Sequence, residues 1–480
     1  MQHKGNNRAN LTRTEATTVI SELKIRNFKS LETVDLKLGN LNLLVGANAS
    51  GKSNFLDSLR FLQGLANDLS LEEVLNGKPQ SSTSAKWDGI RGGSELVAFR
   101  ARDGVASPAF FFEVKQLLLS GDSDCMYTVE AAPSSGNLIR ETIAIKGGAH
   151  WSEIGDSTIP SATDGAERGD YHSSVIPRLI SWTEIRRTFL ENRRLLAESV
   201  ELSAKTDPEK RKRVAKELAK VHDNTLKIQQ LMSEVTSRFH MENLDPMDDE
   251  TEKLGKEAGR IFSLIGDLQA IDPRPDLLKK YSKSSTVTRM DESGGGLAGI
   301  VHRINENPEA KSALLEWLKE LRPDEISDLI TIKGAVDDFM IAIQEGTKQF
   351  PAEVLSDGTL RFIALTVAFF QPSMPKVLMI EDIEKGLHPS RLRLLLEMLR
   401  SQSRRTGTQV FATTHSPTLL NWLTEEDRKT TFVCSRDSES GATKMRSLTE
   451  VPKLEELIRK NYNLDQLFEE GWLESVLHES

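Results

Sequence analysis

Apolar and polar positions alternate with a strand-like period in the first part of the chain. Residues 19–25, 36–38 and 41–45 are short apolar runs typical of strands, and the last run leads directly into a glycine. Between about residues 95 and 145, further runs rich in Val, Phe, Tyr and Thr are separated by turn-forming residues. This pattern predicts an antiparallel sheet, followed by a loop without clear period over residues 147–168.

The middle of the chain has a helical period. One predicted helix carries apolar side chains at steps of three, four and seven, namely Trp182, Ile185, Phe189, Leu196 and Val200. A second helix follows a heptad pattern through Val214, Leu218, Val221, Ile228, Met232, Val235 and Phe239. Together they predict an antiparallel coiled-coil arm. A third helix is predicted by Leu254, Ala258, Ile261, Ile265 and Leu268, and it ends at Asp272 and Pro273.

The last third of the chain returns to alternating helices and strands. A helix is predicted over residues 310–321, and strands are predicted over 330–332 and 339–343. Because strands alternate with helices on both sides of the arm, the predicted fold class is α/β, with the antiparallel sheet attached to it.

These changes of period divide the chain into four parts. We expect a flexible tail over residues 1–18 and the N-terminal part of an α/β head over 19–175. The helical insertion is expected over 176–285, and the C-terminal part of the head over 286–480.

Composition and charge exclude several other classes of protein. The net charge of −9 gives no general attraction to nucleic acid, so such binding would need a local basic patch. Cys125 and Cys434 lie far apart and indicate neither a disulfide framework nor a zinc site. The longest apolar run, residues 362–370, is too short to cross a membrane, and no secretory signal precedes the first strand. A cytoplasmic protein is therefore expected.

The clearest chemical motif is the segment 46–53, Gly-Ala-Asn-Ala-Ser-Gly-Lys-Ser, which fits the P-loop pattern between a strand and a helix. In such a loop, backbone N–H groups bind phosphate oxygens, Lys52 faces the β and γ phosphates, and Ser53 is a ligand for Mg²⁺. A chance glycine-rich turn is the alternative. We expect ATP and Mg²⁺ here, with the nucleotide held by Gly46, Asn48, Ser50, Gly51, Lys52, Ser53 and Asn54.

A second motif is the buried run 377–380, which ends in two acids, Glu381 and Asp382. This form is typical of a parallel strand that carries a Walker B carboxylate at its end. Glu381 is assigned to the Mg²⁺ shell, and Asp382 to orienting or deprotonating the attacking water. A core strand whose acids are merely solvated is the other interpretation.

Two further segments accompany this strand. Ser356, Asp357 and Gly358 precede an amphipathic helix, where they fit either a plain N-cap or an anion-binding signature. His415 follows an apolar strand and is a candidate catalytic contact for the γ-phosphate, with a purely structural histidine as the alternative.

The order of these motifs resembles the ABC-type ATPases of the SMC, RecF and OLD branch. The resemblance covers residues 19–115 and 297–425, and it adds Asn27 and Lys29 as expected nucleotide contacts. It implies an ABC-type P-loop head with a mixed central sheet, flanking helices and the antiparallel sheet, into which the coiled-coil arm is inserted. In such heads the signature of one copy, with Ser356, covers the ATP bound by another. The implied assembly is a head-to-head homodimer or a higher homo-oligomer.

Within this branch, the segments 355–361 and 386–389 are most similar to compact ATPases of bacterial anti-phage systems, such as Septu and PARIS subunits. These act with a separate nuclease-like effector. The resemblance implies an ATP-hydrolysing switch that controls such an effector; a DNA-repair or chromosome-maintenance ATPase and an ATP-binding scaffold are the alternatives. Contact with nucleic acid stays open, because the basic run 205–216 is either a binding patch or a solvated helix face.

Two positions depart from the pattern of this branch. Ala49 stands where Gly is usual, which is tolerated only if this residue needs no positive φ. Asp382 stands where Glu is usual, so the carboxylate is one methylene shorter. Because a displacement on the order of 1 Å can lower a rate about 100-fold, slow hydrolysis is expected.

Overall fold

The computed structural model describes residues 18–80, 86–101, 104–118, 125–134, 137–147, 150–154, 249–283, 287–321, 326–335 and 338–478. The predicted coiled-coil arm and the basic run 205–216 lie outside these residues. Among the described helices, none is both long and apolar enough to cross a membrane. Both cysteines are buried and unpaired, and burial raises the pKa of each thiol to about 12.

The first sheet is antiparallel throughout. Its strand order is β2-β1-β4-β5-β6-β7, formed by β2 (Leu31–Lys37), β1 (Thr18–Phe28), β4 (Phe110–Leu118), β5 (Cys125–Ala132), β6 (Asn137–Gly147) and β7 (His150–Ile154). Alternate side chains of β5 are buried, as expected for a strand with one face on the core. The predicted antiparallel sheet is confirmed. The predicted loop 147–168 is wrong at its start, because β7 pairs there with β6.

The central sheet is parallel except at one edge. Its order is β16-β15-β3-β14-β13-β8, formed by β16 (Thr443–Ser447), β15 (Thr431–Arg436), β3 (Leu41–Val45), β14 (Gln409–Thr414), β13 (Val377–Ile380) and β8 (Leu268–Ile271). β16 alone runs antiparallel to its neighbour among these described strands. Because parallel strands end at the same edge, β3, β13 and β14 bring their C-terminal loops together.

Strand β8 corrects the predicted third helix. The helix, α6 (Asp249–Gly266), ends earlier than expected, and Leu268 begins a strand that pairs with Val377. A four-residue apolar run carries too little period to distinguish strand from helix, and the sheet decides by giving its backbone groups partners.

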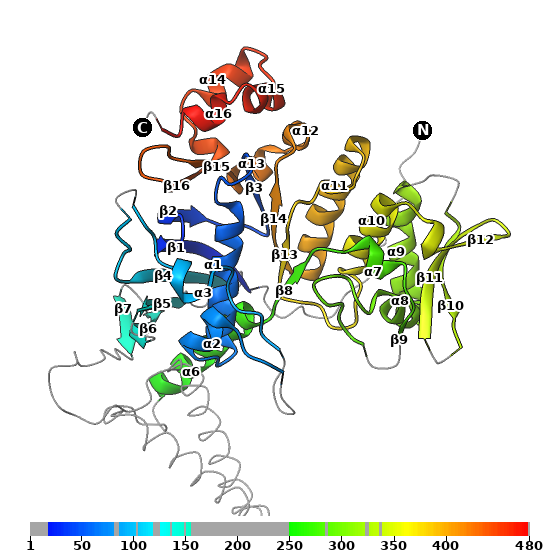
Figure 1. Cartoon of the computed structure of the whole chain (residues 1–480), viewed down its shortest axis with the longest axis horizontal. Helices are drawn as coiled ribbons and strands as arrows, with labels where there is room; N and C mark the ends of the chain where they lie inside the picture. Colours follow the sequence, from blue (N-terminus) through cyan, green and yellow to red (C-terminus); the bar gives the residue numbers. More distant parts are fainter. Residues whose placement is uncertain are drawn as a thin grey trace, which may run out of the picture.

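The central sheet lies between two groups of helices (Figure 1), and a hydrophobic core fills each side. Leu378 and Ile380 of β13 face one core, and Val377 and Met379 face the other. The second core holds α1 (Lys52–Ala66), α2 (Leu71–Asn76) and α6, near α3 (Gly93–Leu96); the first holds α8 (Leu297–Asn305), α9 (Pro308–Leu321), α10 (Asp357–Val367) and α11 (Pro389–Thr406). Because both faces of β13 are buried, its sequence is continuously apolar.

The remaining elements flank these layers. A third, smaller antiparallel sheet joins β9 (Ser282–Lys283), β10 (Asp328–Lys333), β11 (Asp338–Glu345) and β12 (Lys348–Pro351). Short helices complete the described chain, namely α7 (Pro275–Leu278), η1 (Ala352–Val354), α12 (Pro417–Leu420), α13 (Glu425–Lys429), η2 (Leu448–Glu450), α14 (Leu454–Arg459), α15 (Leu464–Glu469) and α16 (Trp472–Ser475). The strands predicted at 330–332 and 339–343 and the helix predicted at 310–321 are confirmed.

Candidate nucleotide site

The segment 46–53 forms a tight loop between β3 and α1, as predicted. A Cβ on Gly46 would lie 2.2 Å from the main-chain oxygen of Cys434, and one on Gly51 would lie 2.1 Å from Oγ1 of Thr443. Gly51 also has φ 102°, a conformation that residues with a side chain rarely adopt. The close approach of β15 and β16 therefore requires glycine at both positions.

Ala49 does not meet the condition under which its methyl group was expected to be tolerated. Its φ is 64°, in the left-handed region, which costs a residue with a side chain about 1–2 kcal/mol. The loop thus has the conformation of a glycine-containing P-loop in spite of Ala49, and packing elsewhere in the head must offset the strain.

The polar groups of the loop fit a polyphosphate. Lys52 is buried, and its Nζ donates to the main-chain oxygens of Gly46 (2.7 Å) and Ala47 (2.8 Å). Ser50 Oγ is buried and makes no hydrogen bond to any described residue. Asn48 is exposed at the tip of the loop. A cation and an unsatisfied hydroxyl beside backbone N–H groups are the features that an anionic phosphate chain would satisfy.

The structure brings Ser53 and Glu381 together from distant parts of the chain. Ser53 Oγ donates to Glu381 Oε1 over 2.5 Å, so the start of α1 meets the end of β13. A hydroxyl and a carboxylate at one point are hard oxygen ligands of the kind that Mg²⁺ prefers, so this pair fits the metal predicted from the sequence.

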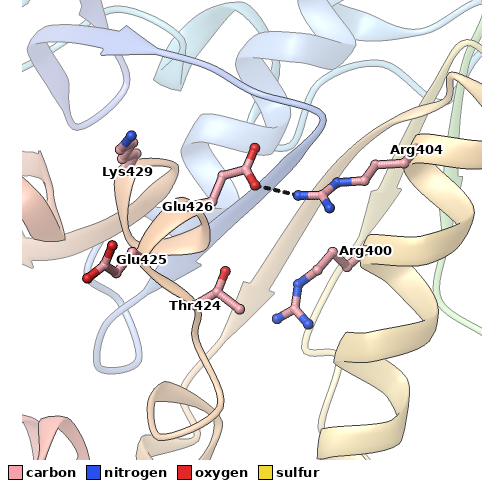
Figure 2. A pocket seen from close by; sticks show the side chains of 6 residues that line it. All are labelled: Arg400, Arg404, Thr424, Glu425, Glu426 and Lys429. Carbon is pink, nitrogen blue, oxygen red and sulfur yellow. Dashed lines mark hydrogen bonds and ion pairs between the residues drawn. The ribbon is translucent and has the colours of Figure 1, made fainter.

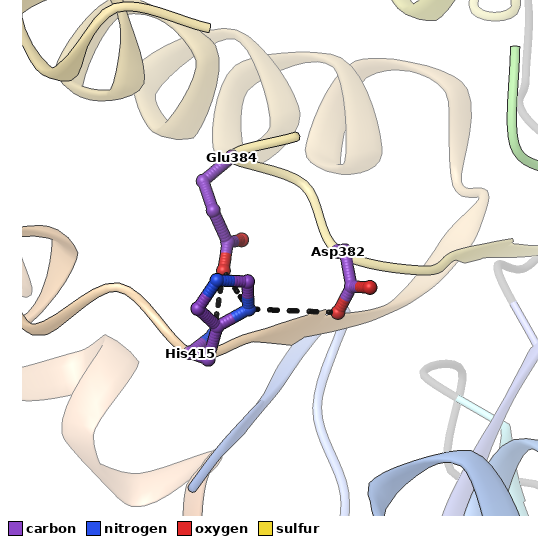
Figure 3. Close-up of side chains that lie close together, drawn as sticks. All are labelled: Asp382, Glu384 and His415. Atoms are coloured by element: carbon purple, nitrogen blue, oxygen red, sulfur yellow. Dashed lines mark hydrogen bonds and ion pairs between the residues drawn. The ribbon is translucent and has the colours of Figure 1, made fainter. Parts of the chain in front are cut away.

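Asp382, Glu384 and His415 form a second group at the same sheet edge (Figure 3). His415 Nδ1 lies 2.8 Å from Glu384 Oε1 and 3.9 Å from Asp382 Oδ1. Their ligand atoms lie within 4.8 Å of one another, close enough to share a metal ion. Asp382 and His415 were predicted site residues; Glu384 was not, although its place two residues after Asp382 could have indicated it.

Lys29 contacts α1 through Asp57, and the main-chain oxygen of Asn27 accepts from the N–H of Phe99. Both have positive φ (59° and 51°), and Lys29 Nζ pairs over 2.5 Å with the buried carboxylate of Asp57. Burial lowers the pKa of Lys29, and the charge of Asp57 opposes this shift. Asn54 is also engaged, since its Nδ2 donates to Ser30 Oγ. These residues therefore fix the surroundings of the loop.

Arg91 is a site residue that the sequence did not reveal. It donates to Asp57 through Nε, to the main-chain oxygen of Ser53 over 2.9 Å, and to Glu381 Oε1 over 3.3 Å. Burial alone would lower the pKa of Arg91, but the hydrogen bonds and charge of Asp57 raise it. Arg91 thus contacts both predicted metal ligands, Ser53 through its main-chain oxygen and Glu381 through its carboxylate. No local motif marks this position.

The signature segment lies apart from the P-loop of its own chain. Ser356 caps α10 by accepting from the N–H of Thr359 over 3.2 Å, and Asp357 pairs with Lys279 over 2.8 Å. Ser356 and Asp357 are exposed, and Val354 just before them is 65% exposed. In Figure 1, α10 and α1 stand apart, with β13, β14 and α11 between them in the view. The two predicted halves of the site are thus not brought together within one chain.

Gly358 allows the start of α10 to pack closely on the turn that follows β13. A Cβ at this position would lie 2.3 Å from the main-chain oxygen of Gly386. Such a contact with backbone cannot be relieved by rotating a side chain, so the packing requires glycine here.

Arg361 connects the signature helix to the end of β13. This side chain is buried, and its Nη2 donates to the main-chain oxygens of Glu381 (3.0 Å) and Asp382 (3.1 Å). Its Nη1 pairs with Asp272 over 2.6 Å. Burial alone would raise the pKa of Asp272, but hydrogen bonds from Arg361 and Lys385 lower it. The orientation of the signature helix is therefore tied to the acidic end of the strand.

The C-terminal segment also reaches the P-loop. Glu474 in α16 accepts a 2.9 Å hydrogen bond from the backbone N–H of Ala47. His478 holds the same segment to β15, since its Nε2 lies 2.7 Å from Ser435 Oγ and its Nδ1 lies 3.3 Å from Asp437. Glu474 lies 427 positions from Ala47 in sequence, and no local pattern pointed to it.

Of two hollows on the surface of the described residues, the smaller one lies at the site described above. The larger hollow, about 560 Å³, is lined by Arg400, Arg404, Thr424, Glu425, Glu426 and Lys429 (Figure 2). Arg400 and Arg404 of α11 face the acids of α13 across it, as in the 2.6 Å pair of Arg404 and Glu426, and its lining includes no motif residue. A smaller hollow of about 110 Å³ lies between Arg91, Asp272 and Glu381. We take the chemistry to lie beside the smaller one.

Known proteins match two parts of the chain. Residues 156–421, more than half of the chain, match the family described as "AAA domain, putative AbiEii toxin, Type IV TA system". Residues 19–90, which include the P-loop, match the family described as "AAA ATPase domain".

Individual relatives match over short segments. An ATP/GTP phosphatase of Helicobacter pylori is 30% identical over 95 residues, which are 19% of this chain and 25% of that protein. The DNA replication and repair protein RecF of Streptococcus uberis is 48% identical over 44 residues, 9% of this chain and 12% of that protein. The chain thus spans a quarter or less of the length of these relatives.

Solved structures of Smc head domains align with most of the chain. The Smc head domain of Pyrococcus furiosus, with an extended coiled coil and bound to the C-terminal domain of ScpA, has a TM-score of 0.41 and 13% identity, and the alignment covers 92% of this chain and all of that one. The SMC head domain from Thermotoga maritima has a TM-score of 0.40 and 10% identity, with 89% and 98% covered. The fold described above rests on the strands and helices of this chain itself.

Proposed function

This chain belongs to the AbiEii-type AAA domain family, and from that premise we propose that it is an ATP-hydrolysing switch of a bacterial defence system that controls a separate effector protein. ATP binding and hydrolysis are the shared core of the two matching families, both described as AAA domains. The observation that carries the proposal is the 2.5 Å contact of Ser53 with Glu381, which joins the P-loop to the acidic end of β13.

The proposed chemistry uses three groups of residues. Backbone N–H groups of the loop and Lys52 bind the phosphates, while Ser53 and Glu381 would hold Mg²⁺. When bound, Mg²⁺ neutralises charge on the β- and γ-phosphate oxygens. Asp382 orients or deprotonates the attacking water. Its shorter side chain is consistent with slow turnover, which suits a switch.

We further propose that two copies assemble head to head around ATP. Two observations support this assembly: the exposed signature with Val354 beside it, and the separation of α10 from α1 in Figure 1. In the assembly, Ser356 of one copy would reach the ATP held by the other, using the N-terminus of α10 as an anion-binding element.

The defence role is proposed from the description of the matching family. The name of the matching family refers to a toxin and to a toxin–antitoxin system, which supports a defence role. The nuclease-like character of the partner protein follows from the resemblance of the motifs and is itself proposed. A DNA-repair ATPase is the second candidate, favoured by the short match to RecF.

The proposed function is tested by measuring ATP hydrolysis and dimer formation in the wild type and two variants. Purified wild-type protein is expected to hydrolyse ATP slowly in Mg²⁺, Lys52→Ala to lose ATP binding, and Asp382→Ala to bind ATP and accumulate as a dimer in size-exclusion chromatography with light scattering. Normal turnover by Asp382→Ala would refute its assigned role. ATP-dependent affinity for DNA without any effect on a co-expressed effector would favour the repair function instead.

A further inference from the structure

We infer that Glu384 is a positioning residue for His415, and that it keeps the imidazole from hydrogen-bonding to Asp382. The inference rests on the proposed ATPase function and deepens it by adding a residue that holds the catalytic group in place. The hydrogen bonds of Glu384 go to His415 and not to the P-loop residues Ser53 or Lys52, so its role is to act through the histidine.

One carboxylate oxygen of Glu384 engages His415 twice. Glu384 Oε1 accepts from the backbone N–H of His415 over 2.6 Å and lies 2.8 Å from its Nδ1. An acceptor at Nδ1 selects the tautomer with the proton on that nitrogen and fixes the orientation of the ring. His415 is thereby held at both its backbone and its side chain.

The difference in burial supports a positioning role. The side chain of Glu384 is only 10% exposed, whereas those of Asp382 and His415 are 42% and 47% exposed. Its second oxygen, Oε2, is buried and makes no hydrogen bond to any described residue. Because a buried carboxylate is costly unless it is hydrogen-bonded, the two N–H groups of His415 stabilise Glu384 in turn.

The turn itself does not need Glu384. The N–H of Asp382 donates to Thr413 Oγ1 over 2.9 Å, the N–H of Ile383 donates to the main-chain oxygen of Thr413 over 3.0 Å, and Ile383 is fully buried. These contacts already fix the turn after β13 against the end of β14. The carboxylate of Glu384 is therefore free to serve His415.

Holding His415 in this way keeps the carboxylate of Asp382 available as the general base. Nδ1 lies 3.9 Å from Asp382 Oδ1, so a small rotation of an unrestrained ring would let it donate to Asp382. Such a bond would occupy the carboxylate that is to accept a proton from water. Glu384 prevents this by binding the Nδ1 proton itself.

The test compares two variants of Glu384 in steady-state kinetics. Glu384→Ala should lower kcat about 10–100-fold with little change in KM, while Glu384→Gln, whose amide oxygen still accepts, should recover most of the rate. In a His415→Gln background, Glu384→Ala should have no further effect. Equal losses in the Ala and Gln variants, or additive losses in the double variant, would overturn the inference.

A second readout separates this inference from the proposed function. In ¹⁵N-histidine-labelled protein, with the His415 signal assigned by its loss in His415→Gln, the wild type should show a protonated Nδ1, and Glu384→Ala should lose that preference. If the wild type fails to hydrolyse ATP, the proposed function fails while this measurement still decides the positioning. An unchanged ring signal in Glu384→Ala contradicts the inference.

Discussion

The backbone N–H of Ala47 donates a hydrogen bond to the carboxylate of Glu474, a residue of the C-terminal helix α16. This places a negative charge beside the loop that is expected to bind a polyphosphate. Replacing Glu474 with Gln keeps an acceptor but removes the charge, so the dissociation constant for ATP should fall about 2–5-fold, as for the loss of a solvent-screened like charge. Calorimetric titration with ATP measures it. Glu470→Gln, an exposed acid in the same segment, is the control, and an equal effect there would contradict the prediction.

Ala49→Gly should stabilise the protein. The left-handed φ of Ala49 favours Gly, and after the greater chain entropy of Gly in the unfolded state is subtracted, the free energy of unfolding should rise by roughly 0.5–1 kcal/mol. Urea unfolding checks this value. Ala47→Gly is the matched control, because Ala47 lacks a positive φ, and it should destabilise the protein. Lower stability of Ala49→Gly would show that the strain is absent.

Arg361→Met should destabilise the head and impair turnover. The substitution removes a buried guanidinium that donates to Asp272 and to the main-chain oxygens of Glu381 and Asp382. Breaking such an ion pair should lower the free energy of unfolding by about 3 kcal/mol. Arg393→Met, which breaks an exposed pair with Glu397, should cost less than about 0.5 kcal/mol. Similar unfolding curves for the two variants would contradict the role of Arg361.

Mixing two inactive variants should restore activity if the site is shared. Lys52→Ala lacks a working P-loop, and Ser356→Arg lacks a working signature. A mixed dimer of the two still contains one site in which an intact P-loop faces an intact signature. With random mixing and independent sites, up to about a quarter of wild-type ATPase activity is expected. The unmixed variants, first shown to be folded by thermal melting, are the controls. A mixture as inactive as its parts would count against sharing.

The stability of the head should fall in acid through Asp427. Burial alone would raise the pKa of this carboxyl, but hydrogen bonds from Arg400 and Thr424 lower it. With the folded pKa below the unfolded value of about 3.9, the stabilisation is present above the unfolded pKa and is lost as the pH falls through the folded pKa. The melting temperature of Asp427→Asn should therefore be lower than that of the wild type at pH 7 and should fall less between pH 7 and pH 3. Glu426→Gln, exposed beside it, should follow the wild type.

The sequence by itself determined the local elements of the site. Gly46 and Gly51 in a strand-to-helix junction, the apolar run before Glu381 and the cap at Ser356 are patterns of neighbouring residues, so each could be identified without the fold. Strands of the parallel sheet were predictable where flanking turns marked them, but not β8, whose four residues carry no period.

Tertiary structure alone decided which distant residues meet. Arg91 and Glu474 reach the site through packing of the sheet edge and the C-terminal helices, and nothing in their own sequence neighbourhoods specifies those contacts. Glu384 stands two residues after Asp382 in sequence, but only the packing of β13 beside β14 brings it to His415. The left-handed φ of Ala49 was also beyond the sequence, because it runs against the preference of alanine and is held by the folded loop between β3 and α1.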